Sequence, residues 1–412
     1  LRVTCLISIV IAGCGGGACL IPGDDGSCGA GGGGGGGGGP SFHSYGDPQL
    51  LKLAGSLALV VSSADDSDQY FGYAGDYREE LALPPPADGT APMLLPTAIP
   101  DGYSPSVACS DVCIAAWHTE QDATVRATIR DAGGWSPQIA FDKAIQSPAV
   151  AAFGDVLLVA WGAWEDDVGA RVELRRLDRS GTVTGSWTLA TGTTQGHLSV
   201  TASAIGGLVT WQRVDATSEH YAAWIDAQLL DANGAPDGAP LEQPITSGDT
   251  DYYRGAPAVY ASGVYRVTHA GLGDGGPWFA VDPVARTITL DPLAGLTGPI
   301  DQIVPLADGF ALVVGGLAIV HVVGDQLVQS VAITGPATIA SVAGGGLTAA
   351  YAKDGSVYVA SIPPTLDSVD DEQPVAIRYQ VDGGGCSSTR GDASFVLVIA
   401  ACALIRRRHC TG

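Results

Sequence analysis

A recurring strand–turn–strand unit constrains the fold of this chain more than any other feature. Each copy starts with a short run of small or β-branched residues, often after proline, passes through a turn usually containing glycine, and ends in an apolar run often closed by tryptophan. Clear copies span 105–117, 148–161, 198–211, 257–269, 302–314 and 338–351, and a degenerate first copy lies around 55–61. They recur roughly every 35 to 60 residues, which is the spacing of β-propeller blades.

A third strand and a polar turn follow the better copies of the unit. Residues 171–177 lead into Asp178 to Gly181, and residues 222–230 lead into Asp231 to Gly234, with the residue types that tight hairpins need. No helical period of useful length is present between Cys14 and Cys386.

We therefore predict an all-β fold, a β-propeller of about seven blades over residues 48–368. The tryptophans that end strands are expected to pack between blades. Closure with six or eight blades is an alternative, because the first and last copies are weak. A pair of β-sandwiches is the alternative fold.

The N-terminal residues have the order of an export signal. Leu1 and Arg2 precede a short apolar stretch, which ends in Ile11-Ala12-Gly13-Cys14. This resembles the bacterial lipobox, and the resemblance implies cleavage before Cys14 and lipid attachment to that cysteine. The alternative is an ordinary signal peptide that is cut elsewhere. The glycine-rich stretch that follows Cys14 is expected to be a flexible tether.

The C-terminal residues have three parts in a fixed order. Gly385 and Cys386 come first, an apolar stretch follows over 393–405, and a basic run closes it. The basic run consists of Arg406, Arg407 and Arg408. The pattern resembles the MYXO-CTERM sorting signal of myxobacterial surface proteins, which implies a hydrophobic sorting helix, processing near the cysteine, and arginines held on the cytoplasmic side. A plain C-terminal membrane anchor is the alternative.

These two ends predict where the protein is found. We expect export through the general secretory route to the cell envelope, either the outer membrane or the cell surface. Membrane attachment would use the lipid, the C-terminal helix or both. The expected domain boundaries are 1–13 for the signal peptide, 14–47 for the tether, 48–368 for the propeller, 369–385 for a linker and 386–412 for the sorting and anchor segment.

Charge argues against nucleic acid as a partner. The chain has 412 residues with 20 Lys and Arg against 43 Asp and Glu, a formal net charge of −23. Phosphate binding needs clustered basic residues, and the only such run is the terminal one. The acidity is expected to serve solubility.

Two cysteines flank the tip of one expected hairpin. Cys109 and Cys113 are separated by Ser110-Asp111-Val112, and opposed cysteines on neighbouring strands come close enough to bridge. Export favours a disulfide over a catalytic cysteine. No CxxC motif or histidine cluster accompanies them, so we expect neither a metal site nor a cofactor.

The strand motif is also similar to repeats of secreted bacterial propellers of the sialidase-like class. A sialidase would need an arginine cluster, a Tyr–Glu pair and Asp-box turns, and Thr128 to Trp135 is the nearest match to an Asp box. The loop aromatics Tyr252, Tyr253 and Trp278 are a possible surface for a sugar or peptide. We therefore expect a non-enzymatic protein that binds a protein or glycan, or builds the envelope. The alternative is a divergent sialidase-like glycoside hydrolase.

Overall fold

The computed structural model describes residues 43–375 with several gaps. The gaps are 54–55, 66–76, 84–94, 101–104, 120–121, 146, 166–168, 193, 216–221, 246–257, 269–277, 291–295, 297–299, 317, 325, 334, 336, 343 and 354–355. The expected lipidation site Cys14, the glycine-rich tether and the sorting segment with Cys386 lie outside the described residues. No helix within the described ranges is long and apolar enough to cross a membrane.

The described strands form antiparallel sheets, and the strands of each sheet follow one another in the sequence. Sheet 1 contains β1 (His43–Leu53), β2 (Ser56–Asp65), β3 (Tyr77–Leu83) and β4 (Leu95–Pro100). Sheet 2 contains β5 (Ser106–Cys109), β6 (Cys113–His118), β7 (Thr124–Asp131), β8 (Gly134–Trp135) and β9 (Ile139–Lys143). Sheet 3 contains β10 (Ala149–Phe153), β11 (Val156–Glu165), β12 (Gly169–Leu177) and β13 (Val183–Thr191).

The second half of the described chain repeats the same order. Sheet 4 contains β14 (Thr194–Ser203), β15 (Gly206–Asp215), β16 (Ala222–Leu230) and β17 (Leu241–Ile245). Sheet 5 contains β18 (Ala258–Ala261), β19 (Val264–Thr268), β20 (Trp278–Asp282) and β21 (Thr287–Leu290). Sheet 6 contains β22 (Ile300–Pro305), β23 (Phe310–Val314), β24 (Ala318–Val323) and β25 (Gln326–Ala332). Sheet 7 contains β26 (Ala337–Ser341), β27 (Leu347–Lys353), β28 (Ser356–Ile362) and β29 (Asp370–Pro374).

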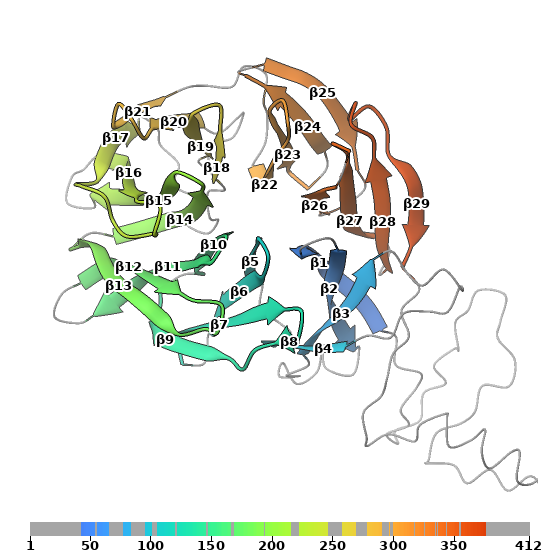
Figure 1. The fold of residues 1–412 in the computed structure, drawn as a ribbon, viewed down its shortest axis with the longest axis horizontal. Coiled ribbons are helices and arrows are strands. Elements are labelled where there is room, and N and C mark those ends of the chain that lie inside the picture. Colours follow the sequence, from blue (N-terminus) through green and yellow to red (C-terminus); the bar gives the residue numbers. More distant parts are fainter. Residues whose placement is uncertain are drawn as a thin grey trace, which may run out of the picture. The chain divides into compact units, whose positions relative to one another are not determined.

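The sheets are arranged as a β-propeller, with the first strand of each sheet nearest the centre (Figure 1). Six of these sheets are regular four-stranded blades. Sheet 2 differs, because its third strand β7 pairs with both β8 and β9 and the sheet has five strands. The strands begin at His43 and end at Pro374, a few residues beyond the expected limits of 48 and 368. The last strand was missed because its sequence, DDEQP, has no apolar alternation.

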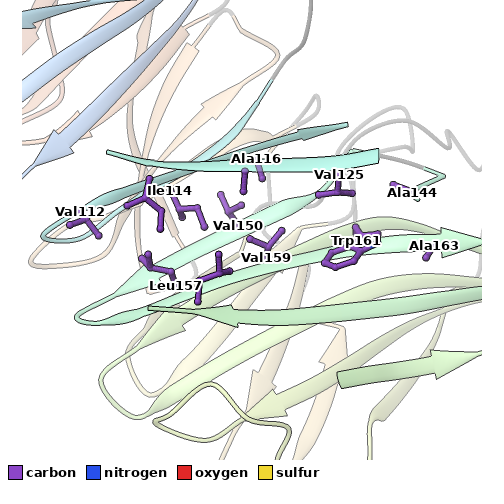
Figure 2. Packing of buried hydrophobic residues seen from close by; sticks show 13 residues of the cluster. Val112, Ile114, Ala116, Val125, Ala144, Val150, Leu157, Val159, Trp161 and Ala163 are labelled. Atoms are coloured by element: carbon purple, nitrogen blue, oxygen red, sulfur yellow. The ribbon is translucent and has the colours of Figure 1, made fainter. Parts of the chain in front are cut away.

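The blades pack face to face through small and branched apolar side chains. Between sheets 2 and 3, Ile114, Val125 and Val150 meet Val159 and Leu157 in one buried cluster (Figure 2). The middle strands bury alternate residues toward one neighbouring sheet and the rest toward the other, so they are buried on both faces. This explains the continuous apolar runs that follow each glycine turn in the sequence.

Side chains join the first and last sheets of the propeller. Among the described strands, sheet 1 uses only the first four and sheet 7 only the last four, and none is shared between the two sheets. Leu59 and Val61 of β2 instead pack with Ala350 and Val357 of sheet 7. The Lys52 ammonium on β1 also donates a 2.8 Å hydrogen bond to the Ser341 hydroxyl on β26.

The aromatic residues that end the second strands are buried between blades, as the sequence predicted. Trp117, Trp161 and Trp211 are each at most 1% exposed. Tyr351 has the corresponding place in sheet 7 and is also 1% exposed. These bulky side chains fill the space between adjacent sheets at the level of the second strands.

The buried tyrosine predicts sensitivity to alkaline pH. Burial raises the pKa of the Tyr351 hydroxyl well above its ordinary value of 10.0, and Glu372 adds to the shift. A raised folded-state pKa contributes stability below about pH 10, which is lost as the pH rises further. We expect the free energy of unfolding to fall by about 1.4 kcal/mol per pH unit above pH 10 for this group. Urea unfolding of wild type and of Tyr351→Phe across this pH range tests the prediction. An equal change of the free energy of unfolding with pH in the two proteins would contradict it.

Candidate functional site

The two faces of the propeller differ in how they are built. The turns joining first to second strands and third to fourth strands meet at one face, here called the turn face. Connections from second to third strands, and from one sheet to the next, meet at the opposite face, here called the loop face. This follows from the antiparallel order of the strands in each sheet.

The turn face is held together by links between successive sheets. Arg179 of sheet 3 donates to Asp111 of sheet 2 at 2.8 Å and to Asp155 in its own sheet. Arg176 donates to the carbonyl of Asn233 at 2.7 Å, and Arg286 donates to the carbonyl of Asp237 at 2.8 Å. These arginines and their acceptors already have hydrogen-bond partners, so on this face they link neighbouring sheets.

Several turns on this face are closed by an aspartate. The Asp178 carboxylate accepts hydrogen bonds from the Ser180 hydroxyl and from the backbone N–H groups of Thr182 and Ser180, and these lower its pKa. Gly181 adopts a φ of +84°, which favours glycine at this position. The Asp131 turn of the approximate Asp box is similar, because its carboxylate accepts from the N–H of Gly133 at 2.8 Å. These motifs shape turns.

The tryptophan of that Asp-box-like segment joins two sheets. Trp135 donates its indole N–H to Glu80 of β3, and Arg130 of β7 binds the same carboxylate through two nitrogens at 2.9 Å. Glu80 is buried and the Arg130 side chain is only 15% exposed. The cluster therefore connects sheets 1 and 2 through a desolvated ion pair.

A sialidase-like cluster would need arginines such as Arg171, Arg175, Arg213, Arg254 and Arg266, and of these, Arg171, Arg175 and Arg213 already bind carboxylates. Arg171 and Arg175 on β12 both bind the buried Glu173 between them, at 3.0 and 2.8 Å. Arg175 also lies over the Trp161 ring, 5.0 Å from its centroid. Arg254 lies outside the described residues.

The loop face carries a group of side chains on sheets 3 and 4, here called the aromatic patch, which are exposed or half-buried except for the buried Asp226: Trp164, Arg213, Trp224, Asp226 and Glu242. Arg213 lies over the Trp224 ring, 4.6 Å from its centroid. Its guanidinium binds Asp226 at 2.8 and 3.2 Å and Glu242 at 2.9 Å. Asp226 is buried, and Glu242 is exposed.

Strand register brings these residues together. Arg213 is directly opposite Trp224, and Trp211 is directly opposite Asp226, across the β15–β16 pair. Side chains alternate along a strand, so Arg213 lies on the same side as Trp211, which packs against sheet 3. Trp164 lies on the side of β11 that carries Leu158 and Ala160, which face sheet 4. Trp164 and Arg213 therefore line the same inter-sheet boundary.

Burial and pairing set the electrostatics of the patch. Burial raises the pKa of Asp226, and the bound Arg213 guanidinium opposes this. The pKa of Arg213 is raised above its ordinary value, chiefly by its hydrogen bond to Asp226. The guanidinium is therefore a permanent cation with two carboxylates on it, and the patch has little positive charge left for an anion.

The exposed aromatic surface gives the patch its binding chemistry. The Trp164 side chain is 52% exposed, although it is a large apolar ring beside a boundary between blades. Such a ring offers a stacking surface for the C–H face of a sugar or for an apolar peptide side chain. The exposed carboxylate of Glu242 and the edge of Arg213 offer hydrogen-bond partners nearby.

The predicted site residues have different outcomes. Cys109 and Cys113 are paired in register across the β5–β6 hairpin and form a disulfide, with 4.0 Å between their Cα atoms. Tyr252 and Tyr253 lie outside the described residues. Trp278 is the first residue of β20, and its side chain is not described. No group of three or more potential metal ligands occurs within the described ranges.

The disulfide closes a very short loop, so its stabilising effect should be modest. We expect Cys109→Ser with Cys113→Ser to lower the free energy of unfolding by about 2 kcal/mol, because chain-entropy stabilisation shrinks with loop length. Urea denaturation of the double variant and of wild type, with and without reductant, measures the difference. Through this hairpin, the reductant should lower the free energy of unfolding of wild type and not that of the double variant. A loss above about 4 kcal/mol would contradict this estimate.

Sequence reasoning did not single out the aromatic patch as a site. Trp164 and Trp224 stand out as aromatics near strand ends, but Asp226 and Arg213 are thirteen positions apart and meet only through the β15–β16 register. The one local signal is that Trp164 comes three positions after the buried Trp161, beyond the apolar run that forms the core of this strand.

Comparison with known proteins extends only to the fold. No family model matches the chain, and no curated protein matches it. The β-propeller domain of the Trilobed protease from Pyrococcus furiosus, reported to have an open velcro topology, is 12% identical over 83% of this chain and 100% of its own, with a TM-score of 0.45.

Two further solved structures show the same limits. A prolyl endopeptidase is 13% identical over 81% of this chain and 49% of its own, with a TM-score of 0.49. The subtype N10 neuraminidase-like protein of A/little yellow-shouldered bat/Guatemala/060/2010 is 10% identical over 66% and 81%, with a TM-score of 0.35. The chain spans about half the length of the prolyl endopeptidase. No activity is carried over from these proteins.

Proposed function

We propose that this chain is a non-enzymatic binding propeller of the bacterial cell surface or outer membrane, which recognises a neutral glycan or a peptide through the aromatic patch. In this proposal the five-stranded sheet 2 counts as a seventh blade beside the six regular ones. A role in building the envelope is compatible with the same binding surface.

The observation that carries the proposal is the pairing of the charged groups on this part of the loop face. Arg213 is held by Asp226 and Glu242, and Glu173 is held by Arg171 and Arg175. A sialidase-type site needs arginines free to bind a substrate carboxylate and a carboxyl group free to transfer a proton. The exposed Trp164 ring, by contrast, is available for stacking.

A paired assay separates binding from turnover. The mature protein is applied to a glycan and peptide array, and the same preparation is incubated with aryl glycosides. We expect binding to at least one neutral ligand and no release of the aryl group. Turnover that is lost when an acidic residue near the central channel is replaced would instead support the divergent glycoside hydrolase.

Anchoring at the envelope is the second part of the proposal, and it rests on the sequence. The lipobox ending in Cys14 and the tail with Gly385, Cys386 and the arginines at 406–408 support it. We expect lipid on Cys14 and a mature chain that ends near Cys386. Mass spectrometry of the protein from its native host tests both, and an intact, unlipidated N-terminus would overturn the lipoprotein assignment.

A further inference from the structure

The outer edge of sheet 6 differs from other blade edges. β25 is the last strand of that sheet, and within the described part of the chain it pairs only with β24. Its seven residues, QLVQSVA, include no charge and no proline, and most are exposed. Val328 at its middle is 53% exposed. An edge strand of this kind presents unpaired backbone N–H and C=O groups to any extended chain.

The other outer strands have features that block such pairing. β4 contains Pro96 and Pro100, β17 contains Glu242 and Pro244, and β29 has three acidic residues and a proline. β9 carries adjacent charges, and β21 has only four residues. These are usual protections of a sheet edge.

β13 is the nearest comparison, because it is also uncharged. Its pairing with β12 is interrupted by two register shifts, and its Trp187 ring folds over Gly185 so closely that an added Cβ would be 2.1 Å from it. β13 therefore serves as an internal control for β25.

A cavity of about 500 Å³ lies beside β25. It is lined by four consecutive residues of that strand, 327–330, and by Leu296, Val314, Ala318 and Val320. All four of these additional residues are apolar, and the volume is that of a typical ligand pocket. Gln329 and Ser330 of the strand add polar groups to this lining. Free backbone beside a side-chain pocket is the arrangement by which sheet edges bind extended peptides: the backbone provides affinity and the pocket selects a side chain.

Charge and area decide the occupant. A second copy of the chain would bring another net charge of −23, and pairing two seven-residue strands buries well under the roughly 1,200–2,000 Å² of a stable dimer. A short extended segment that is neutral or basic avoids that repulsion and needs only this edge. We infer that β25 and its cavity form a docking site for an extended, uncharged or basic peptide segment of a partner, with one branched aliphatic side chain in the cavity.

Fluorescence anisotropy with a synthetic probe tests this site on the full mature protein. The probe is a short labelled peptide of alternating threonine and valine with a lysine at each end. A second probe has the same sequence with alternate backbone nitrogens methylated, which removes the hydrogen bonds of one edge. We expect the first probe to bind and to protect β25 amides from hydrogen exchange, and the methylated probe to bind at least about tenfold more weakly, the loss expected from removing a few backbone hydrogen bonds.

Matched variants locate the binding. Val328→Lys and Ser330→Lys place a charge at exposed positions of β25 and should weaken binding of the first probe at least about tenfold. Val183→Lys puts the same charge on β13, where the native valine is 41% exposed, and should leave binding unchanged. Unchanged thermal unfolding of all three shows that folding is intact.

Three results of the probe experiments would overturn the inference, and a fourth would come from the oligomeric state. One is equal binding of the two probes, one is protection of amides away from β25, and one is full binding by both β25 variants. Concentration-dependent dimerisation that Val328→Lys abolishes would assign the edge to a second copy instead. Each outcome is independent of glycan binding at the aromatic patch on sheets 3 and 4.

Discussion

Replacing Trp161 by alanine should lower the free energy of unfolding by about 3–5 kcal/mol, because large-to-small changes at fully buried aromatics lose both burial and packing. Trp161 is fully buried between sheets 2 and 3. Its ring lies 5.3 Å from that of Phe141 on the additional strand β9, and Arg175 lies over it. Its removal would loosen both sheets. Urea or thermal unfolding measures the loss.

Trp164 provides the matched control on the same strand. It is three positions further along β11 and half exposed, so Trp164→Ala should change the free energy of unfolding by no more than about 0.5 kcal/mol. The comparison holds side-chain chemistry constant and varies only burial. A loss of several kcal/mol for both variants would show that Trp164 belongs to the core, which would remove the basis for the aromatic patch.

Replacing Glu80 by alanine should be comparably damaging, with a loss of about 3–5 kcal/mol in the free energy of unfolding. The change removes the carboxylate that binds the Arg130 guanidinium, whose side chain is only 15% exposed. It also removes the acceptor of the Trp135 indole N–H. A buried charge without a partner is costly even where the intact pair contributes little net stability. Because Glu80 connects sheet 1 to sheet 2, hydrogen exchange should also increase in β1 to β4.

An exposed ion pair on the turn face is the control for Glu80. Asp155 binds Arg179, and its side chain is 81% exposed. Asp155→Ala should cost no more than about 1 kcal/mol, because solvent screens such pairs. If Glu80→Ala were equally mild, the carboxylate at residue 80 would not be holding the first two blades together.

The repeat in the sequence predicted the propeller because its chemistry is local. Glycine turns, β-branched alternation and a strand-ending tryptophan lie within single hairpins, and the copy over 148–161 corresponds to β10 and β11. The strand β9 was not predicted, because its alternation is confined to Ile139 and Phe141 within five residues, IAFDK. It pairs with β7 where Phe141 packs on Trp161, which is a tertiary contact.

The candidate site could be predicted only in part, for the same reason. The Cys109–Cys113 pair is four residues apart, so a hairpin argument reaches it. Glu80 and Arg130 are fifty residues apart and belong to different blades. Their meeting depends on how two sheets pack, which no local pattern encodes. The same holds for Trp164 of sheet 3 and Arg213 of sheet 4.

The loop-face end of the boundary between sheets 3 and 4 is the proposed binding surface. Its most direct test is array binding by wild type, Trp164→Ala and Phe153→Ala. Phe153 is 43% exposed and lies at the opposite end of the β10–β11 hairpin, on the turn face. Trp164→Ala should weaken ligand binding about thirtyfold, the effect of truncating a tryptophan at the centre of an interface, while Phe153→Ala binds as wild type does. Binding that is lost with Phe153→Ala and kept with Trp164→Ala would contradict the proposal.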